Sequence, residues 1–549
     1  MYNLNRKQIL LTATLVLSLA ACKKLDLAPS DRFTELTFWQ SNENVANFLN
    51  NVYGGMYSSQ TFFYSEALTD NAVSTRNGNT SGQADIIAGG NFTSTLPRFG
   101  NEWAFYYGGI KSANIFLDNL DKNTTLTGSL KERYRAEARF IRAFHYANLT
   151  NLWGDVPLLK NDISADDAKS VARTPKADVI SFIISELDAV TAALPKKEEY
   201  GAADRGRITR GAALALKARV LLYQGNRMQE VVAACEALID NGAQNGQYAL
   251  VPAYSDVFSP TNEYNSEVIL DLQYAPVTRT WNEFIDFAPI SAGARSNNMA
   301  PTQELVDSYI MLNGRGIRET GSGYNEANPY VNRDPRLAAT IVFDQGEWKD
   351  DPAATARTIY ITPGSTPAGG SNVDEYNTAG QGTPTGYFWR KYYDHTSRSN
   401  NYSSGLNLIL IRYADVLLMY AEAKNALGGL DAATWDKTIG ALRRRAGFSD
   451  PGALNFPSAS TASLTEIIRR ERRSELAMEG RRFDDIRRWG LAETVLNGWA
   501  HGARYGDPAI DNGYLRVQQR GFNSSRNYLW PVPESERALN SSLTQNPNY

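Results

Sequence analysis

The feature that most constrains this chain is a helical hairpin predicted for residues 210–240. Small and apolar side chains recur at helical spacing in residues 211–224 and again in 228–240, and Gly225-Asn226 separates the two stretches. Alanine at a helix crossing lets two helix axes approach closely, whereas larger side chains would separate them. The segment therefore predicts two short antiparallel helices. The residues expected on their contact faces are Ala212, Ala215, Ala218, Leu222, Val231, Ala234, Ala237 and Leu238.

The same periodicity recurs along the chain and predicts a mainly α fold class. Residues 130–152 carry an apolar stripe on one helix face, and Gly154 and Pro157 end this helix. Helix pairs of this kind resemble tetratricopeptide units, so we expect a tetratricopeptide-like scaffold of helical hairpins. Further helices are expected at residues 177–193, 410–427, 435–445 and 464–478.

Between residues 247 and 405 the sequence changes character. Gly, Pro, Ser, Thr and Asn dominate, and helical periodicity is sparse. A loop-rich stretch of this length inside a compact protein is uncommon unless it serves a function. We therefore expect an insertion on the helical scaffold that forms much of a binding face. The expected organisation is a leader at 1–21, a helical region at 22–246, the loop-rich insertion at 247–405 and a second helical region at 406–549.

The N-terminus is typical of a bacterial lipoprotein signal peptide. Arg6 and Lys7 precede an apolar run that is too short to cross a bilayer core of about 30 Å. Leu19-Ala20-Ala21-Cys22 then resembles a lipobox, in which the cysteine thiol receives the lipid. A buried N-terminal helix with an incidental cysteine is the alternative. We expect Cys22 to carry acyl chains such as palmitate, which anchor the protein to the membrane without spanning it.

Composition and motifs exclude several classes of function. The formal net charge is −3, and a mildly acidic chain lacks the basic face that nucleic acid requires. Besides Cys22 the only cysteine is Cys235, so no disulfide framework is possible. The three histidines, His145, His395 and His501, lie in no HExxH, Gly-x-Ser-x-Gly or Cys-x-x-Cys context. We expect no enzyme, no cofactor and no metal site.

The charged residues of the C-terminal region indicate scaffold contacts. Asp484-Asp485 lies among arginines, and the arginines between 469 and 488 alternate with acids at helical spacing. Such interleaving is typical of intramolecular ion pairs. We expect the same of Arg412, Glu422, Glu471 and Arg473, which have apolar neighbours.

Several sequence blocks together resemble one family, the SusD/RagB-like surface lipoproteins. Each block is modest alone, but they run in order from the lipobox to the last residue and cover essentially the whole chain. They are RAEARFIRAFHY at 135–146 with LWGDVPL at 152–158, NRDPRL at 332–337, IRYADVLLMYAEA at 411–423, ERRSEL at 471–476 with EGRR at 479–482, and LWPVP at 529–533 with QNPNY at 545–549.

The resemblance implies a tetratricopeptide-like scaffold beside a loop-rich ligand-binding region. It also implies attachment to the outer membrane, facing the cell surface, and a partner, a SusC-like TonB-dependent transporter. Most members of the family are associated with glycans, oligo- or polysaccharides, and a minority serve peptides. Glycan uptake is therefore the expected function, with capture of oligopeptides as the alternative.

Two segments offer side chains suited to a polar ligand, and neither is carried over from the family. Asp70, Asn71, Arg76 and Asn79 could hydrogen-bond to hydroxyl groups, while Tyr274 and Trp281 could provide stacking faces. A core anchor that packs a loop is the alternative for Trp281. By contrast, Trp103, Tyr106 and Tyr107 are expected mainly in the core.

Overall fold

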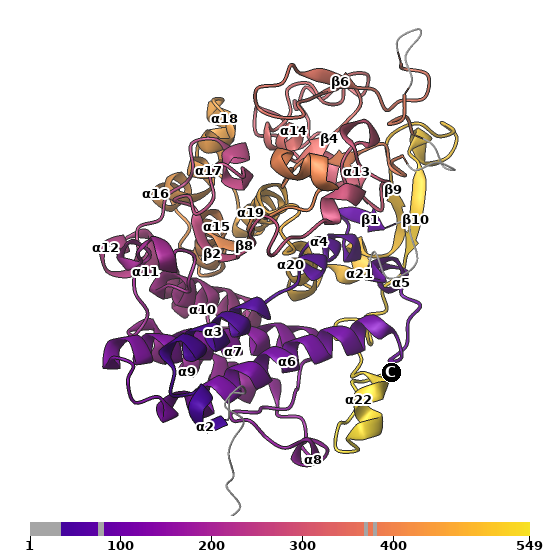
Figure 1. Cartoon of the computed structure of the whole chain (residues 1–549). Helices are drawn as coiled ribbons and strands as arrows, with labels where there is room; N and C mark the ends of the chain where they lie inside the picture. The colour runs from indigo at the N-terminus through magenta and orange to yellow at the C-terminus, as the bar shows by residue number, and fades with distance from the viewer. Residues whose placement is uncertain (1–34, 75–81, 367–371, 377–381) are drawn as a thin grey trace, which may run out of the picture.

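The computed structural model describes residues 35–74, 82–366, 372–376 and 382–549. Long helices form one side of the molecule, drawn in indigo to magenta in Figure 1. Short strands and irregular segments gather on the other side, around β4, β6 and the β9–β10 pair. The expected mainly α fold class is confirmed.

A series of neighbouring helices links the N-terminal region to the C-terminal region. The long helices α6 (Pro97–Asn119) and α7 (Gly128–Trp153) pack together, and α7 contacts α9 (Lys176–Thr191). The series continues from α9 through the hairpin to α15 (Tyr413–Ala426) and α19 (Thr461–Glu475). Helices far apart in sequence therefore share one continuous scaffold.

The predicted hairpin is confirmed by α10 (Arg210–Gln224) and α11 (Met228–Ile239). Thr209 caps the first helix, because its Oγ1 accepts a hydrogen bond from the Ala212 amide at 3.1 Å. Gly225 ends that helix with φ 76°, a conformation that favours glycine. The small residues Ala212, Ala215 and Ala218 are fully buried, as expected for a close helix crossing.

The helix predicted for residues 410–427 begins later than expected. Residues Leu408–Arg412 form the strand β8, which pairs antiparallel with β2 (Val268–Leu272). Every residue of both strands is buried. A short apolar run without polar interruption fits a buried strand as well as a helix, so periodicity alone did not separate the two.

The remaining strands form short antiparallel pairs. Within residues 247–405, only short helices separate the strands. The first pair, β1 (Ala72–Ser74) and β3 (Met299–Pro301), joins this stretch to the N-terminal region. The others are β4 (Ile341–Val342) with β7 (Phe388–Trp389), β5 (Gly346–Trp348) with β6 (Arg357–Ile359), and β9 (Gly498–His501) with β10 (Arg516–Arg520).

The other helices are mostly short and fill the space around the series. They are α2 (Glu35–Phe38), α3 (Asn42–Gly54), α4 (Ser59–Tyr64), α5 (Ala84–Ala88), α8 (Ala165–Ala168), α12 (Gly242–Asn245), α13 (Gln303–Ser308), α14 (Arg336–Thr340), α16 (Ala432–Trp435), α17 (Ala441–Ala446), α18 (Pro451–Leu454), α20 (Arg482–Arg488), α21 (Ala492–Val495) and α22 (Glu534–Leu539). Together with the π turn Asp436–Gly440, α16 and α17 occupy the helix predicted at 435–445.

One large hydrophobic core takes side chains from all three expected regions. It includes Trp103 and Tyr106 from α6, Trp281 from the loop-rich stretch and Trp530 near the C-terminus. Trp103 and Tyr106 are thus core residues, as expected. No helix of the described residues has both the length and the apolar composition needed to cross a membrane.

Helices α6 and α7 lie close together where Gly109 faces His145. A Cβ atom on Gly109 would lie 2.0 Å from His145 Nε2, whereas a Cβ on the neighbouring Gly108 would have nothing within 4 Å. The His145 ring is fully buried. This pair of glycines therefore offers a matched test of helix packing.

We expect Gly109→Ala to lower the free energy of unfolding by about 2 kcal/mol, because the new methyl group overpacks the crossing. Gly108→Ala should raise it by up to about 1 kcal/mol, since alanine favours the helix. Urea unfolding measures both. In a His145→Ala background the cost of Gly109→Ala should disappear, and an unchanged cost would contradict the proposed clash.

Candidate functional site

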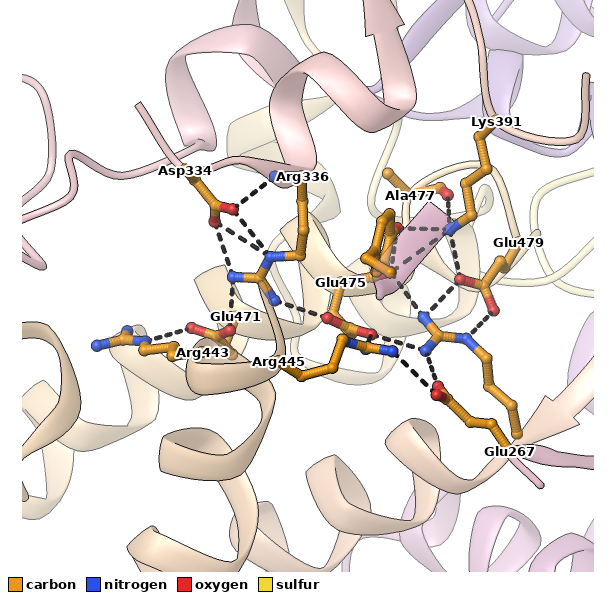
Figure 2. A network of polar contacts seen from close by, with 12 residues as sticks. Glu267, Asp334, Arg336, Lys391, Arg443, Arg445, Glu471, Glu475, Ala477 and Glu479 are labelled. Atoms are coloured by element: carbon orange, nitrogen blue, oxygen red, sulfur yellow. Dashed lines mark hydrogen bonds and ion pairs between the residues drawn. The ribbon is translucent and has the colours of Figure 1, made fainter. Parts of the chain in front are cut away.

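A buried ion-pair network lies between the helical series and the loop-rich stretch (Figure 2). Its centre is Arg412, the last residue of β8, whose side chain is 1% exposed. Arg412 Nη1 lies 2.6 Å from both Glu267 Oε1 and Glu475 Oε1. Its Nη2 and Nε contact the Glu479 carboxylate at 2.7 and 2.8 Å. The guanidinium group thus joins Glu267 to two carboxylates at the C-terminal end of α19 and just after it.

A second arginine extends the network toward α14. Arg336 contacts Asp334, Glu471 and Glu475, each at 2.7 Å. Three further bases form ion pairs with the same carboxylates: Arg443 pairs with Glu471, Arg445 pairs with Glu267 and Glu475, and Lys391 pairs with Glu479. Figure 2 shows that these side chains point toward one another from different elements.

For Glu475 and Lys391, pairing opposes the effect of burial on the pKa. Burial alone would raise the pKa of Glu475, but Arg445, Arg412 and Arg336 lower it far below its usual range. Burial lowers the pKa of Lys391 to about 8, although Glu479 opposes the change. The expected scaffold role of the motif charges is supported, because these side chains face the interior and not the solvent.

The same holds for the other charges singled out in the sequence. Glu422 pairs with Arg488 on α20, and the pKa of Glu422 is lowered to about 2, because Arg488 outweighs the effect of burial. Asp485 pairs with Arg472 and Arg488. Asp484 contacts Arg487. The interleaved acids and arginines are therefore intramolecular ion pairs.

We expect Arg412→Ala to lower the free energy of unfolding by about 3–5 kcal/mol, because three buried carboxylates lose their shared counter-charge. Arg444→Ala is the matched control, since its pair with Asp436 has side chains 45% and 68% exposed and should contribute at most about 1 kcal/mol. Thermal scans beside ligand titrations measure both. Loss of ligand affinity at unchanged stability would contradict the scaffold role.

Asp70 and Asn71 lie inside the protein, which corrects their expected position on a ligand-contacting loop. The Asp70 carboxylate accepts two hydrogen bonds of 2.9 Å from Arg482 and lies 3.0 Å from Arg473 Nη2. Burial would raise the pKa of Asp70, but Arg473 and Arg482 lower it far below its usual range. Asn71 donates to Glu66 at 2.9 Å and accepts from Arg473 at 2.8 Å. The hydrogen-bonding groups of both residues already have partners within the protein.

The other residues expected to contact a ligand are placed differently. Arg76 and Asn79 lie outside the described residues. Trp281 is 3% exposed, its Nε1 donates to the Leu406 carbonyl at 2.7 Å, and its ring lies 4.9 Å from that of Phe63. The core-anchor alternative thus describes Trp281, and in this arrangement neither ring face is free. Tyr274 is half-buried, with the Arg279 guanidinium 5.0 Å from its ring centroid; its contact with ligand stays a prediction.

A different aromatic side chain, Trp499, meets the solvent. Among the described residues it is the one aromatic side chain that is classed as exposed, with 39% of its surface accessible. Trp499 lies on β9, opposite Gln519 of β10. The Arg516 guanidinium lies 5.6 Å from its ring centroid. An accessible ring bordered by an amide and a guanidinium group combines a stacking face with hydrogen-bond donors.

The strand pattern explains why Trp499 faces outward. Side chains alternate between the two faces of a strand, and the next residue, Ala500, packs against Val73 of β1 and Ala300 of β3. Two hydrogen bonds hold the β9–β10 pair against the N-terminal region. Arg520 donates to the Ala72 carbonyl, and the Gly521 amide donates to the Ala88 carbonyl at 3.0 Å. The sequence Gly498-Trp499-Ala500-His501 has no apolar-polar alternation, so no local pattern marked this ring as exposed.

His501 fixes the segment that follows β9. Its Nδ1 lies 2.7 Å from Glu304 of α13, and its Nε2 lies 3.1 Å from Asp511. Hydrogen bonds to Glu304 and Asp511 raise the pKa of His501, although partial burial opposes the change. Asp511 also contacts Arg516 at 2.6 Å. The protonated His501 ring therefore links Glu304 of α13 to Asp511, and Asp511 in turn contacts Arg516 beside Trp499.

We expect the His501 ring to titrate above about 6.5 and His145 not to titrate between pH 5 and 8, because burial lowers the pKa of His145 to about 3. The three histidines make selectively labelled NMR feasible, and His501→Gln assigns the signal. The stabilising contribution of His501 is fully present below the unfolded pKa of about 6.5 and is lost as pH rises through its folded pKa. A His501 midpoint below about 6.5 would contradict the two carboxylate contacts.

The arrangement shows no catalytic constellation in the part of the chain that the structure describes. No group of three or more His, Cys, Asp or Glu side chains there could hold a metal ion. One depression, of about 660 Å³, is lined by residues that include Asp350, Asp351, His395 and Arg398. Its Asp350 carboxylate already accepts from Trp348 Nε1 at 3.0 Å and pairs with Arg398 at 3.4 Å. The depression is polar and open, and suits hydrogen bonding to a polar ligand.

A helical scaffold that carries a face of short strands and loops defines the architectural class of the chain. Comparison with family models identifies the family: residues 266–549 match the SusD family. A second model, described as starch-binding and associating with the outer membrane, matches residues 25–222. The chain therefore belongs to the SusD family, as the sequence blocks indicated.

Individual relatives agree with this assignment. A SusD-like protein, P25, of Formosa agariphila is 27% identical over 419 residues, which cover 72% of this chain and 71% of the relative. The starch-binding protein SusD of Bacteroides thetaiotaomicron is 25% identical and covers 82% of this chain and 78% of its own length. A SusD-like carbohydrate-binding protein of Bacteroides fragilis superposes with a TM-score of 0.82 at 28% identity, over 92% of this chain and all of the solved one.

Proposed function

We propose that this protein is an outer-membrane lipoprotein that binds glycans and delivers them to a SusC-like TonB-dependent transporter. Two relatives named for binding starch or carbohydrate support the ligand class. The description of the matched N-terminal family model supports association with the outer membrane. These two relatives are named as binding proteins, which supports binding without catalysis.

The observation that carries the ligand-binding part is the exposed Trp499 ring. Its neighbours Gln519 and Arg516 offer hydrogen-bond donors at its edge, and Asp511 and His501 hold Arg516 in place through a chain of polar contacts. A sugar ring presents an apolar face of C–H groups and an edge of hydroxyl groups. Stacking on the indole with hydroxyl contacts at the side satisfies both requirements.

The lipid anchor at Cys22 and the transporter partner complete the proposal. The anchor is supported by the lipobox at 19–22, and the partner by membership of the family. Acylation would hold the protein at the membrane surface, where a captured glycan lies close to the transporter. Mass spectrometry of the purified protein tests the anchor, because diacylglycerol and an acyl chain add a defined mass to the peptide that begins at Cys22.

We expect Trp499→Ala to weaken retention by the cognate polysaccharide at least about tenfold in affinity electrophoresis. An aromatic ring that a bound ligand covers is a typical binding hot spot. Trp499→Phe should keep part of the retention, because it preserves a stacking face. Leu427→Ala is the control: Leu427 is 42% exposed, similar to Trp499, but follows α15 on the helical scaffold.

The panel for this test includes neutral and charged polysaccharides and a mixture of oligopeptides measured by calorimetry. Equal retention of the wild type and Trp499→Ala would remove Trp499 from the site. Binding of oligopeptides by a wild type that no polysaccharide retards would contradict glycan binding and favour the oligopeptide alternative.

A further inference from the structure

A second, polar pocket lies away from Trp499, where the segment after α9 faces the start of β2. Its volume is about 470 Å³, within the range of about 300–1,000 Å³ typical of small-molecule sites. We call it the Asp271 pocket. Its lining includes Lys197, Tyr200, Arg205, Glu263, Tyr264 and Asp271.

One of the acids that line this pocket, Asp271, has no ion-pair partner among the described residues. Asp271 is 4% exposed, and its Oδ2 accepts a hydrogen bond from Asn407 Nδ2 at 2.9 Å. No basic side chain of the described chain segments lies within 4.0 Å of this carboxylate. Burial raises the pKa of Asp271 to about 7; the nearby charge of Glu263 adds to this effect, while the hydrogen bond from Asn407 and the charge of Lys197 oppose it. A buried acid of this kind is unusual away from a binding site.

A second unpaired carboxylate lies on the other side of the same asparagine. Glu263 Oε1 accepts from the backbone amide of Asn407 at 2.8 Å, and burial raises the pKa of Glu263. Asn407 therefore holds both acids, one with its main chain and one with its side chain. Amide donors orient the two carboxylates without neutralising their charge.

The bases around the pocket form no ion pair with Asp271 within 4.0 Å, although the charge of Lys197 is near enough to lower the pKa of that acid. Lys197 Nζ donates to the carbonyls of Asn265, at 2.5 Å, and Val268, at 3.2 Å. Arg205 is exposed to solvent, with its guanidinium 5.9 Å from the Tyr264 ring centroid. Tyr264 itself has φ 57°, a strained conformation for a residue with a side chain. Strain of this kind gathers at ligand sites, and here it places a phenol ring at the pocket wall.

We propose that the Asp271 pocket binds an amino-sugar unit, with its ammonium group at the Asp271 and Glu263 carboxylates and its hydroxyl groups at the surrounding polar wall. This inference rests on the proposed glycan function and names one class of sugar. An organic cation fits better than a metal ion, because the described residues offer no group of three acidic or histidine ligands and the volume far exceeds that of an ion.

The test is calorimetric titration of the purified mature protein in detergent at pH 7 with glucosamine, N-acetylglucosamine and glucose. Acetylation removes the ammonium charge, so glucosamine should bind at least about tenfold more tightly than the other two. Asp271→Asn should abolish this preference, and Glu263→Gln should reduce it. Asp166→Asn is the control, since this acid on α8 has a 91% exposed side chain.

Several outcomes would overturn the inference. They are equal affinity for glucosamine and N-acetylglucosamine, an unchanged preference in a folded Asp271→Asn variant, and tight binding of calcium chloride alone with displacement of glucosamine. Thermal unfolding checks the fold of each variant. Retention by a polysaccharide through Trp499 without a glucosamine preference would overturn only this inference, whereas absence of any glycan binding would contradict the proposed function.

Discussion

The fold depends on the ion pairs that Arg412 makes with Glu267, Glu475 and Glu479. Removing charges from water is costly, and only complete pairing with good geometry offsets that cost. Arg336, Arg443, Arg445 and Lys391 supply the remaining counter-charges (Figure 2). Since the partners come from β8, α14, α17, α19 and the residue just before β2, the network joins the loop-rich stretch to the helices that follow it. A hydrophobic contact would tolerate sliding, whereas this network specifies one arrangement.

The contrast between this interior and the surface separates scaffold from function. Most of the charged and aromatic residues that stand out in the sequence are buried and paired, including Asp70 and Trp281. Two places on the described part of the chain offer available side chains for the proposals made above: the Trp499 ring on the β9–β10 pair and the acids of the Asp271 pocket. Neither place is part of the Arg412 network. Ligand-contacting residues in such a design can change without disturbing the buried charges.

The helices were predictable because each buries one face against a neighbour. Apolar residues therefore recur along the sequence with the period of a helix. The 210–240 hairpin matches almost residue by residue. β8 was not predictable in this way, because four apolar residues in a row carry no period. The site was harder still: Trp281 and Trp499 are chemically identical, and only the surrounding tertiary structure buries one and exposes the other. Asp271 likewise gives no local signal, since its isolation depends on Asn407, 136 residues away.

The β9–β10 pair is held in place by contacts with residues near the start of the chain. Arg520 donates to Ala72, 448 residues earlier in the chain. Contacts of such long sequence separation form late, because a long loop must close first. The Trp499 surface is therefore completed only after the last tenth of the chain has joined the first helices. A chain without its C-terminal end would therefore lack this surface, and with it the ligand contact proposed for Trp499.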